Sequence, residues 1–103
     1  MIEQIHAINH GLDLRFPEGR DPFQIITRLA EECGELAAQV NHFEGGGVKR
    51  QKHGEPDKMK LAKEVMDVLR CALQVAAYYH VEAELDAVVQ ASFDTMIREG
   101  WIQ

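Results

Sequence analysis

The sequence lacks most of the signals that would place it outside the helical proteins. Its 103 residues include only two cysteines, three prolines and one tryptophan. No stretch alternates apolar and polar residues with β-branched enrichment, which predicts an all-α protein. Both cysteines, Cys33 and Cys71, fall in apolar helical stretches, so we expect reduced core thiols rather than a disulfide.

Long apolar runs and an excess of basic residues are also missing. No apolar run approaches 18 residues and no signal segment opens the chain, so we expect a cytoplasmic protein without a membrane partner. The net charge of −6 argues against nucleic acid as a partner. With that charge, a polyphosphate needs metal ions or a local basic patch before it can approach.

Helical periodicity is what the chain does contain. We expect a single domain over residues 1–103, built as a four-helix-type bundle and completed by oligomerisation, because so short a chain has a modest core. One short and three long helices are predicted: a helix over 2–10 ended by Gly11, a helix over 22–43 with Asp21 as N-cap, a helix over 57–80, and one from the turn at 80–81 to Gly100. We expect residues 44–56 to form a loop.

Two acidic pairs lie on two of the predicted helices. Glu32 and Glu35 are three residues apart, as are Glu64 and Asp67, so each pair shares one side of its helix. Like charges this close repel, and a hard cation such as Mg²⁺ would remove the repulsion. The pairs therefore indicate a divalent-metal site for a phosphate-bearing substrate. The same spacing also fits an ordinary solvated helix face, and by itself leaves both interpretations open.

The sequence around these pairs resembles the signature motif of a known family. The run at 31–35 (EECGE) and the run at 64–67 (EVMD) look like the E-E-x-x-E…E-x-x-D signature of MazG-like all-α nucleoside triphosphate pyrophosphohydrolases. The resemblance covers about residues 22–99. It implies an enzyme that uses Mg²⁺, or Mn²⁺ in its place, to cut a nucleoside triphosphate into a monophosphate and pyrophosphate, as housekeeping of surplus or noncanonical (deoxy)nucleotides.

The resemblance also implies roles for particular residues. Four carboxylates would be metal ligands: Glu32, Glu35, Glu64 and Asp67. Glu31 would assist them or bind an additional ion, and either Glu31 or Glu35 could activate the attacking water. Three cations are candidates for binding the substrate phosphates: Lys60, Lys63 and Arg98. The segment 49–52 could close over a triphosphate.

One departure and two alternatives remain. Arg70 and Cys71 stand where family members often carry an aromatic residue near the base or sugar, so the preferred nucleotide is left open. A related enzymatic possibility is a phosphoribosyl-ATP pyrophosphatase. A possibility of another class is a non-catalytic helical module for nucleotide sensing or dimerisation. The family resemblance further implies a homodimer or homotetramer.

Overall fold

The computed structural model describes all 103 residues, which form five α-helices, one short 3₁₀ helix and no strand. The all-α fold is therefore confirmed. The elements in chain order are α1 (Ile2–Arg15), η1 (Pro17–Arg20), α2 (Pro22–Glu44), α3 (Gly46–His53), α4 (Lys58–Tyr78) and α5 (Glu82–Arg98). None of the helices combines the length and the apolar character needed to cross a membrane.

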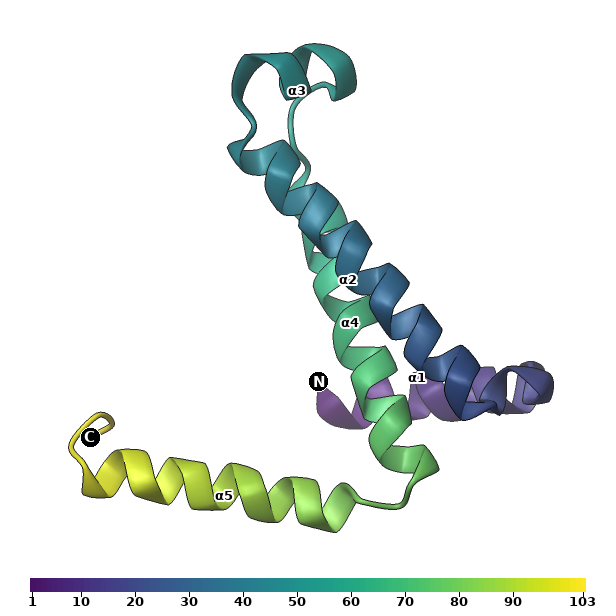
Figure 1. Ribbon diagram of the computed structural model, residues 1–103, viewed down its shortest axis with the longest axis vertical. Coiled ribbons are helices and arrows are strands. Elements are labelled where there is room, and N and C mark those ends of the chain that lie inside the picture. The colour runs from purple at the N-terminus through teal and green to yellow at the C-terminus, as the bar shows by residue number, and fades with distance from the viewer.

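Helices α2 and α4 run antiparallel and form the main packed pair, with α3 at its tip (Figure 1). Both helices begin at an aspartate cap. The Asp21 carboxylate accepts hydrogen bonds from the backbone N–H of Phe23 (2.8 Å) and Gln24 (3.3 Å). The Asp57 carboxylate accepts one from the N–H of Met59 (2.8 Å). These bonds satisfy donors that a helix start leaves free, and the predicted starts of both helices are confirmed.

Helix α1 crosses the base of this pair and continues past the predicted end at Gly11 (Figure 1). Ile5 and Asn9 are buried one turn apart, and Asn9 Nδ2 donates to the Arg70 carbonyl of α4 at 3.0 Å. Gly11 is accommodated inside the helix. The prediction was wrong because the stop signal is Pro17, which disfavours a helical conformation at Phe16.

The predicted loop over 44–56 was wrong for its central part. Residues 46–53 form α3, because Val48 is followed by a run of long polar residues with good helix propensity. Gly46 (φ 67°) begins the helix and Gly54 (φ 80°) ends it. Both have positive φ, which glycine adopts without the steric cost of a Cβ atom, so the chain can reverse direction around α3.

Helix α5 does not join the other helices within one chain. Helix α5 extends from the base of the α2/α4 pair, so the C-terminus lies far from that pair (Figure 1). Helix α4 ends at Tyr78, and His80 (φ 55°) turns the chain while the Val81 N–H donates to the Ala76 carbonyl at 3.0 Å. The radius of gyration is 17.1 Å, whereas a compact domain of this length has about 13 Å. Helix α5 therefore does not complete a bundle within one chain, and the predicted completion by oligomerisation stays a prediction.

The core is correspondingly small. Its buried apolar residues are Ile5, Ile25, Cys71 and Ala76. Both thiols are free, and Cys71 is a fully buried core thiol as predicted. Burial raises the pKa of the Cys71 thiol and so keeps it protonated. Cys33 is exposed, so its placement in the core was wrong.

We predict that Asp21→Ala lowers the free energy of unfolding by about 1 kcal/mol, because it removes the acceptor that caps α2. Urea denaturation at fixed protein concentration measures the change. Asp86→Ala, at an exposed position inside α5, is the control and should change stability much less. Equal losses in the two variants would contradict the capping role.

Candidate active site

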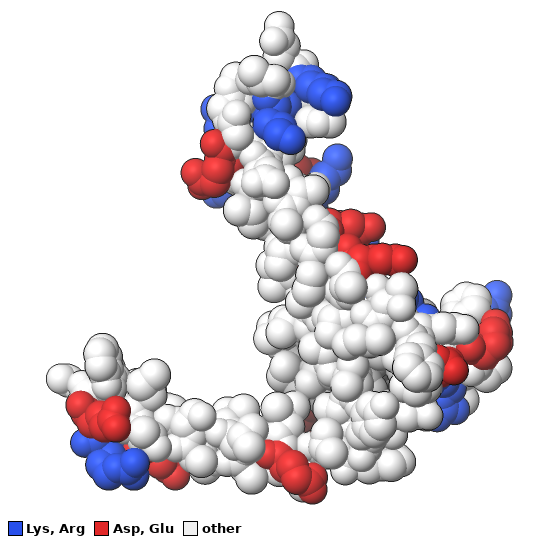
Figure 2. Space-filling view, in the orientation of Figure 1, with Lys and Arg blue, Asp and Glu red and all other residues white.

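Three carboxylates meet halfway along the α2/α4 pair. Glu32 and Glu35 of α2 and Glu64 of α4 each offer one oxygen, and these three oxygens lie within 4.8 Å of one another. Figure 2 shows acidic side chains on this part of the pair, below the basic side chains of α3. The antiparallel packing thus brings residues 32 and 64 together although α3 lies between them in the sequence.

These residues fit a divalent cation. Glu32 Oε2 and Glu64 Oε2 are buried and have no hydrogen-bond partner. A buried carboxylate oxygen without a partner is costly, and a cation is the partner that would satisfy two such oxygens at once. Because every donor in the group is a carboxylate oxygen, the set suits a hard ion such as Mg²⁺ or Mn²⁺.

The electrostatics of the cluster agree with this fit. Burial raises the pKa of Glu32, and the nearby charges of Asp67 and Glu35 raise it further. Burial also raises the pKa of Glu64, and the nearby charge of Glu35 raises it further. Both shifts mean that the cluster holds protons more tightly than isolated carboxylates do, because burial and the concentration of negative charge both disfavour the ionised form.

Asp67 is buried beside this group and is bound by two cations. Lys63 Nζ lies 2.8 Å from Asp67 Oδ2, and Arg70 Nε lies 3.9 Å from Asp67 Oδ1. The hydrogen bond to Asp67 raises the pKa of Lys63. Lys63, predicted to bind substrate phosphate, therefore already uses its ammonium group on Asp67.

The remaining predicted site residues lie at different distances from the cluster. Glu31 is exposed and falls outside the group of three carboxylates. Lys60 is one helical turn before Glu64 and lines a pocket near α3. Arg98 lies at the end of α5, where it donates to Thr95 Oγ1 at 3.2 Å, and one chain does not bring it to the carboxylates.

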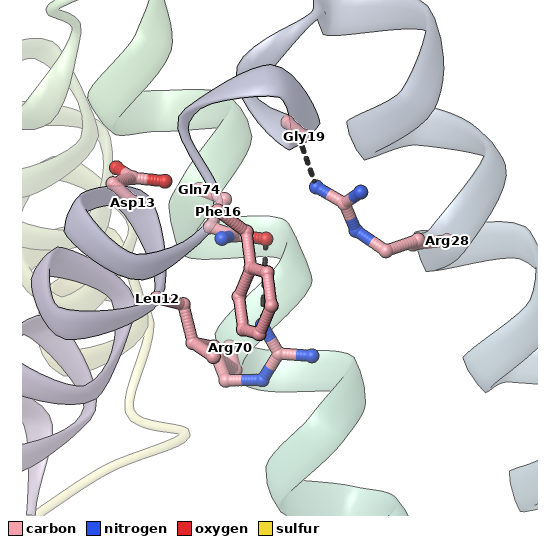
Figure 3. A pocket seen from close by; sticks show the side chains of 7 residues that line it. All are labelled: Leu12, Asp13, Phe16, Gly19, Arg28, Arg70 and Gln74. Atoms are coloured by element: carbon pink, nitrogen blue, oxygen red, sulfur yellow. Dashed lines mark hydrogen bonds between the residues drawn. The ribbon is translucent and has the colours of Figure 1, made fainter.

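A polar pocket next to Asp67 contains two arginines that were not among the predicted site residues. This pocket of about 200 Å³, called the η1 pocket below, is shown in Figure 3. Arg28 donates to the Gly19 carbonyl at 2.7 Å, and Arg70 donates to Gln74 Oε1 at 3.5 Å. Its lining residues are Leu12, Asp13, Phe16, Gly19, Arg28, Arg70 and Gln74.

Helical spacing could have revealed both arginines. Arg28 precedes Glu32 by four residues and Arg70 follows Asp67 by three, so each shares a helix face with a carboxylate of the cluster. The missing information was the position of η1 and α1, which close the pocket from the other side.

The fold and the site define an all-α protein with a carboxylate cluster between two antiparallel helices, and this cluster fits a divalent cation. Comparison with known proteins gives the family. The model of the MazG nucleotide pyrophosphohydrolase domain matches residues 20–99, and the chain belongs to this family. The match supports a function of the nucleotide pyrophosphohydrolase type.

A curated relative is the uncharacterized protein YpjD of Bacillus subtilis (strain 168). It is 32% identical over 89 residues, which cover 84% of this chain and 78% of the relative. No solved structure matches the chain.

We predict that Glu64→Gln stabilises the metal-free protein at pH 7.5. The folded-state pKa of Glu64 is raised, so the folded protein binds more protons than the unfolded chain, and stability falls as pH rises through the window above the ordinary glutamate value. Removing this charge should raise the free energy of unfolding by about 0.2–0.5 kcal/mol for each neighbouring carboxylate that no longer repels residue 64.

Denaturation in EDTA between pH 4 and pH 8 measures this effect. The stability that Glu64→Gln gains over the wild type should shrink toward pH 4, where Glu64 is also protonated in the unfolded chain. Glu31→Gln, which is exposed and outside the cluster, is the control and should show little change with pH. A Glu64→Gln protein that is less stable than the wild type at pH 7.5 in EDTA would contradict the account.

Proposed function

We propose that this protein is a Mg²⁺-dependent pyrophosphohydrolase that cleaves (deoxy)nucleoside triphosphates to monophosphates and pyrophosphate, with Mn²⁺ as a substitute metal. The observation that carries the proposal is the meeting of three carboxylates, two of them with unpartnered buried oxygens, on the helices that bear the family signature. Its role would be housekeeping of nucleotide pools, and its location in the cytoplasm remains a prediction.

The metal would be held by Glu32, Glu35 and Glu64, with Asp67 completing the set from the adjacent turn of α4. A bound Mg²⁺ supplies neutralisation of phosphate charge and activation of water. The protein itself positions these carboxylates by packing α2 against α4, while Lys63 and Arg70 hold Asp67 in place.

The reaction needs a base for the attacking water. Water oxygen bonds to the α-phosphorus, the bond from that phosphorus to the bridging oxygen breaks, and pyrophosphate leaves with this oxygen. Glu31 and Glu35 are the two candidates that accept the water proton. Glu35 lies within the carboxylate group and Glu31 lies exposed one turn before it, so their variants separate the two roles.

The η1 pocket is assigned to the nucleoside end of the substrate. It adjoins Asp67 through Arg70, and it combines the half-exposed ring of Phe16 with hydrogen-bonding groups of Arg28 and Gln74 (Figure 3). An aromatic ring and a guanidinium plane both stack on nucleobases, and this chain uses them in place of the aromatic residue that the family often has after Asp67.

The protein is further proposed to work as a homodimer or homotetramer. Only seven of its 103 residues are buried, which is too few for a stable separate domain. The elbow between α4 and α5 forms an apolar pocket of about 470 Å³, and the space-filling view shows almost no charged side chains on this concave side (Figure 2). A second chain covering this face could also bring its own last helix, with Arg98, to the site.

We predict that Glu35→Gln and Asp67→Asn each lower kcat by about 10²–10⁴-fold, the range that an acid–base or ligand residue contributes. The assay incubates the protein with Mg²⁺ and a panel of dNTPs, NTPs and phosphoribosyl-ATP, and identifies the products by chromatography. Glu3→Gln, exposed on α1, is the control and should retain wild-type turnover.

Each alternative gives a different outcome in that assay. Release of orthophosphate from every triphosphate would contradict the proposal. Turnover confined to phosphoribosyl-ATP would assign the protein to the related biosynthetic reaction. A metal-dependent rise in melting temperature without turnover of any substrate would indicate a non-catalytic module. Full activity in Glu35→Gln would show that Glu31 or another group is the base.

We predict that Phe93→Glu dissociates the oligomer. Phe93 is nearly half exposed on the apolar stripe of α5, where a charge would be buried against the partner. Light scattering should give a multiple of 11.7 kDa for the wild type and a smaller mass for the variant. Ala87→Glu adds the same charge on the opposite face of α5 and should leave the mass unchanged. A monomeric wild type would contradict the proposed assembly.

A further inference from the structure

The polar stripe that carries the carboxylates continues toward α3. On α2, Glu35 is followed by Gln39 and His42 at helical spacing, so all three share one face. On α4, Lys60 precedes Glu64 by one turn on the corresponding face. A second polar pocket therefore adjoins the carboxylates on the side opposite to the η1 pocket.

This pocket, called the α3 pocket below, has a volume of about 270 Å³ and one apolar lining residue. His42 Nε2 lies 2.7 Å from the Gly54 carbonyl, and because a carbonyl only accepts, His42 donates from Nε2. The His53 ring meets the His42 ring edge to face at 5.7 Å. The lining residues are Ala38, Gln39, His42, His53, Glu55, Asp57 and Lys60.

One polar atom in the α3 pocket lacks a partner. Gln39 Oε1 is buried and makes no hydrogen bond. Since an amide group can be turned to present either its oxygen or its NH₂, Gln39 can donate to a ligand oxygen at this place. A buried amide without a partner costs stability, which a bound polar ligand would restore.

The hydrogen-bond donors of the α3 pocket suit an anion. Its two carboxylates are engaged within the fold, Asp57 by the Met59 N–H at 2.8 Å and Glu55 by Arg50 at 3.8 Å. Lys60 makes no ion pair with another side chain. Further basic residues of α3 gather at the tip of the helix pair (Figure 2). The Lys60 ammonium and the Gln39 amide thus remain available to a ligand oxygen, beside two carboxylates that already have partners.

We propose that the α3 pocket binds the β- and γ-phosphates of the substrate and retains the pyrophosphate product. The inference rests on the proposed function and adds the direction in which the substrate lies. Arg28 is one turn before Glu32, and Gln39 is one turn after Glu35, so the η1 and α3 pockets lie at opposite ends of the carboxylate cluster. A linear triphosphate with its α-phosphate at the cluster and its nucleoside in the η1 pocket must extend its terminal phosphates toward α3.

The test compares the two products as ligands. Binding of pyrophosphate and of the nucleoside monophosphate, each with Mg²⁺, is measured by calorimetry on the wild type and on Lys60→Met and His53→Phe. Each variant should bind pyrophosphate about tenfold or more weakly, as expected for one lost hydrogen bond to a charged group. Monophosphate binding should stay within about twofold. His6→Ala, exposed on α1, is the histidine control and should bind both products normally.

Three results would overturn the inference. They are unchanged pyrophosphate binding in both variants, equal weakening of both products, and loss of the monophosphate alone, which would place the nucleoside at α3. Circular dichroism checks that the variants are folded, and His53→Phe retains the aromatic ring that faces His42. Because calorimetry needs no turnover, an inactive wild type would count against the proposed function and leave this test intact.

Discussion

The site depends on charge of one sign forced together where two helices pack. Glu32, Glu35 and Glu64 present oxygens within 4.8 Å of one another between α2 and α4. Without a cation, the negative charges of these carboxylates repel one another. The carboxylates are held together by contacts farther along the α2/α4 pair, where Ile25, Cys71 and Ala76 are buried. There Asn9 of α1 also donates a hydrogen bond to α4. The packing offsets a local repulsion that a bound cation would relieve, as is common where stability and function compete.

The antiparallel pairing also fixes an order along the molecule. From the base to the tip, the polar face passes from the arginines of the η1 pocket to the carboxylates and then to the histidines and lysine of the α3 pocket. Each pocket has its own covering element, η1 with α1 at one end and α3 at the other. The proposed direction of the substrate follows from this order, because the η1 pocket and the α3 pocket lie on opposite sides of the carboxylates.

The cations near the cluster divide into two kinds. Lys63 and Arg70 contact Asp67 and so support the buried wall of the site. Lys60 has no partner within the chain and remains available to a ligand. Arg98 is separated from the site by the course of α5 and could reach a cluster only in another chain. The contacts of each side chain decide these roles, whereas its distance along the sequence from a carboxylate does not.

The acidic pairs could be predicted because their spacing is a local property of a helix, and the signature text then linked the two helices. The long helices were predictable for the same reason, from Asp21 as a cap and from the apolar stripes, whereas the capping role of Asp57 emerged only in the structure. The end of α1 was not, since Gly11 is tolerated once Asn9 anchors the helix to Arg70. The direction of α5 could not be predicted either. An apolar stripe on a helix does not show whether the helix packs within its own chain or against a second chain.

Local sequence patterns also could not predict helix α3 or the two pockets. Three consecutive glycines look like a loop, yet only Gly46, the first residue of α3, has a positive φ among them. The pockets arise where this helix and η1 meet the α2/α4 pair, which is tertiary information.

The most direct measurement is a crystal structure of the protein with Mg²⁺ and a dNTP whose bridge between the α- and β-phosphates is an imido group. We expect Mg²⁺ at about 2.0–2.1 Å from carboxylate oxygens of Glu32, Glu35 and Glu64, with the α-phosphate beside it. Metal and nucleotide bound elsewhere, with these carboxylates free of both, would contradict it.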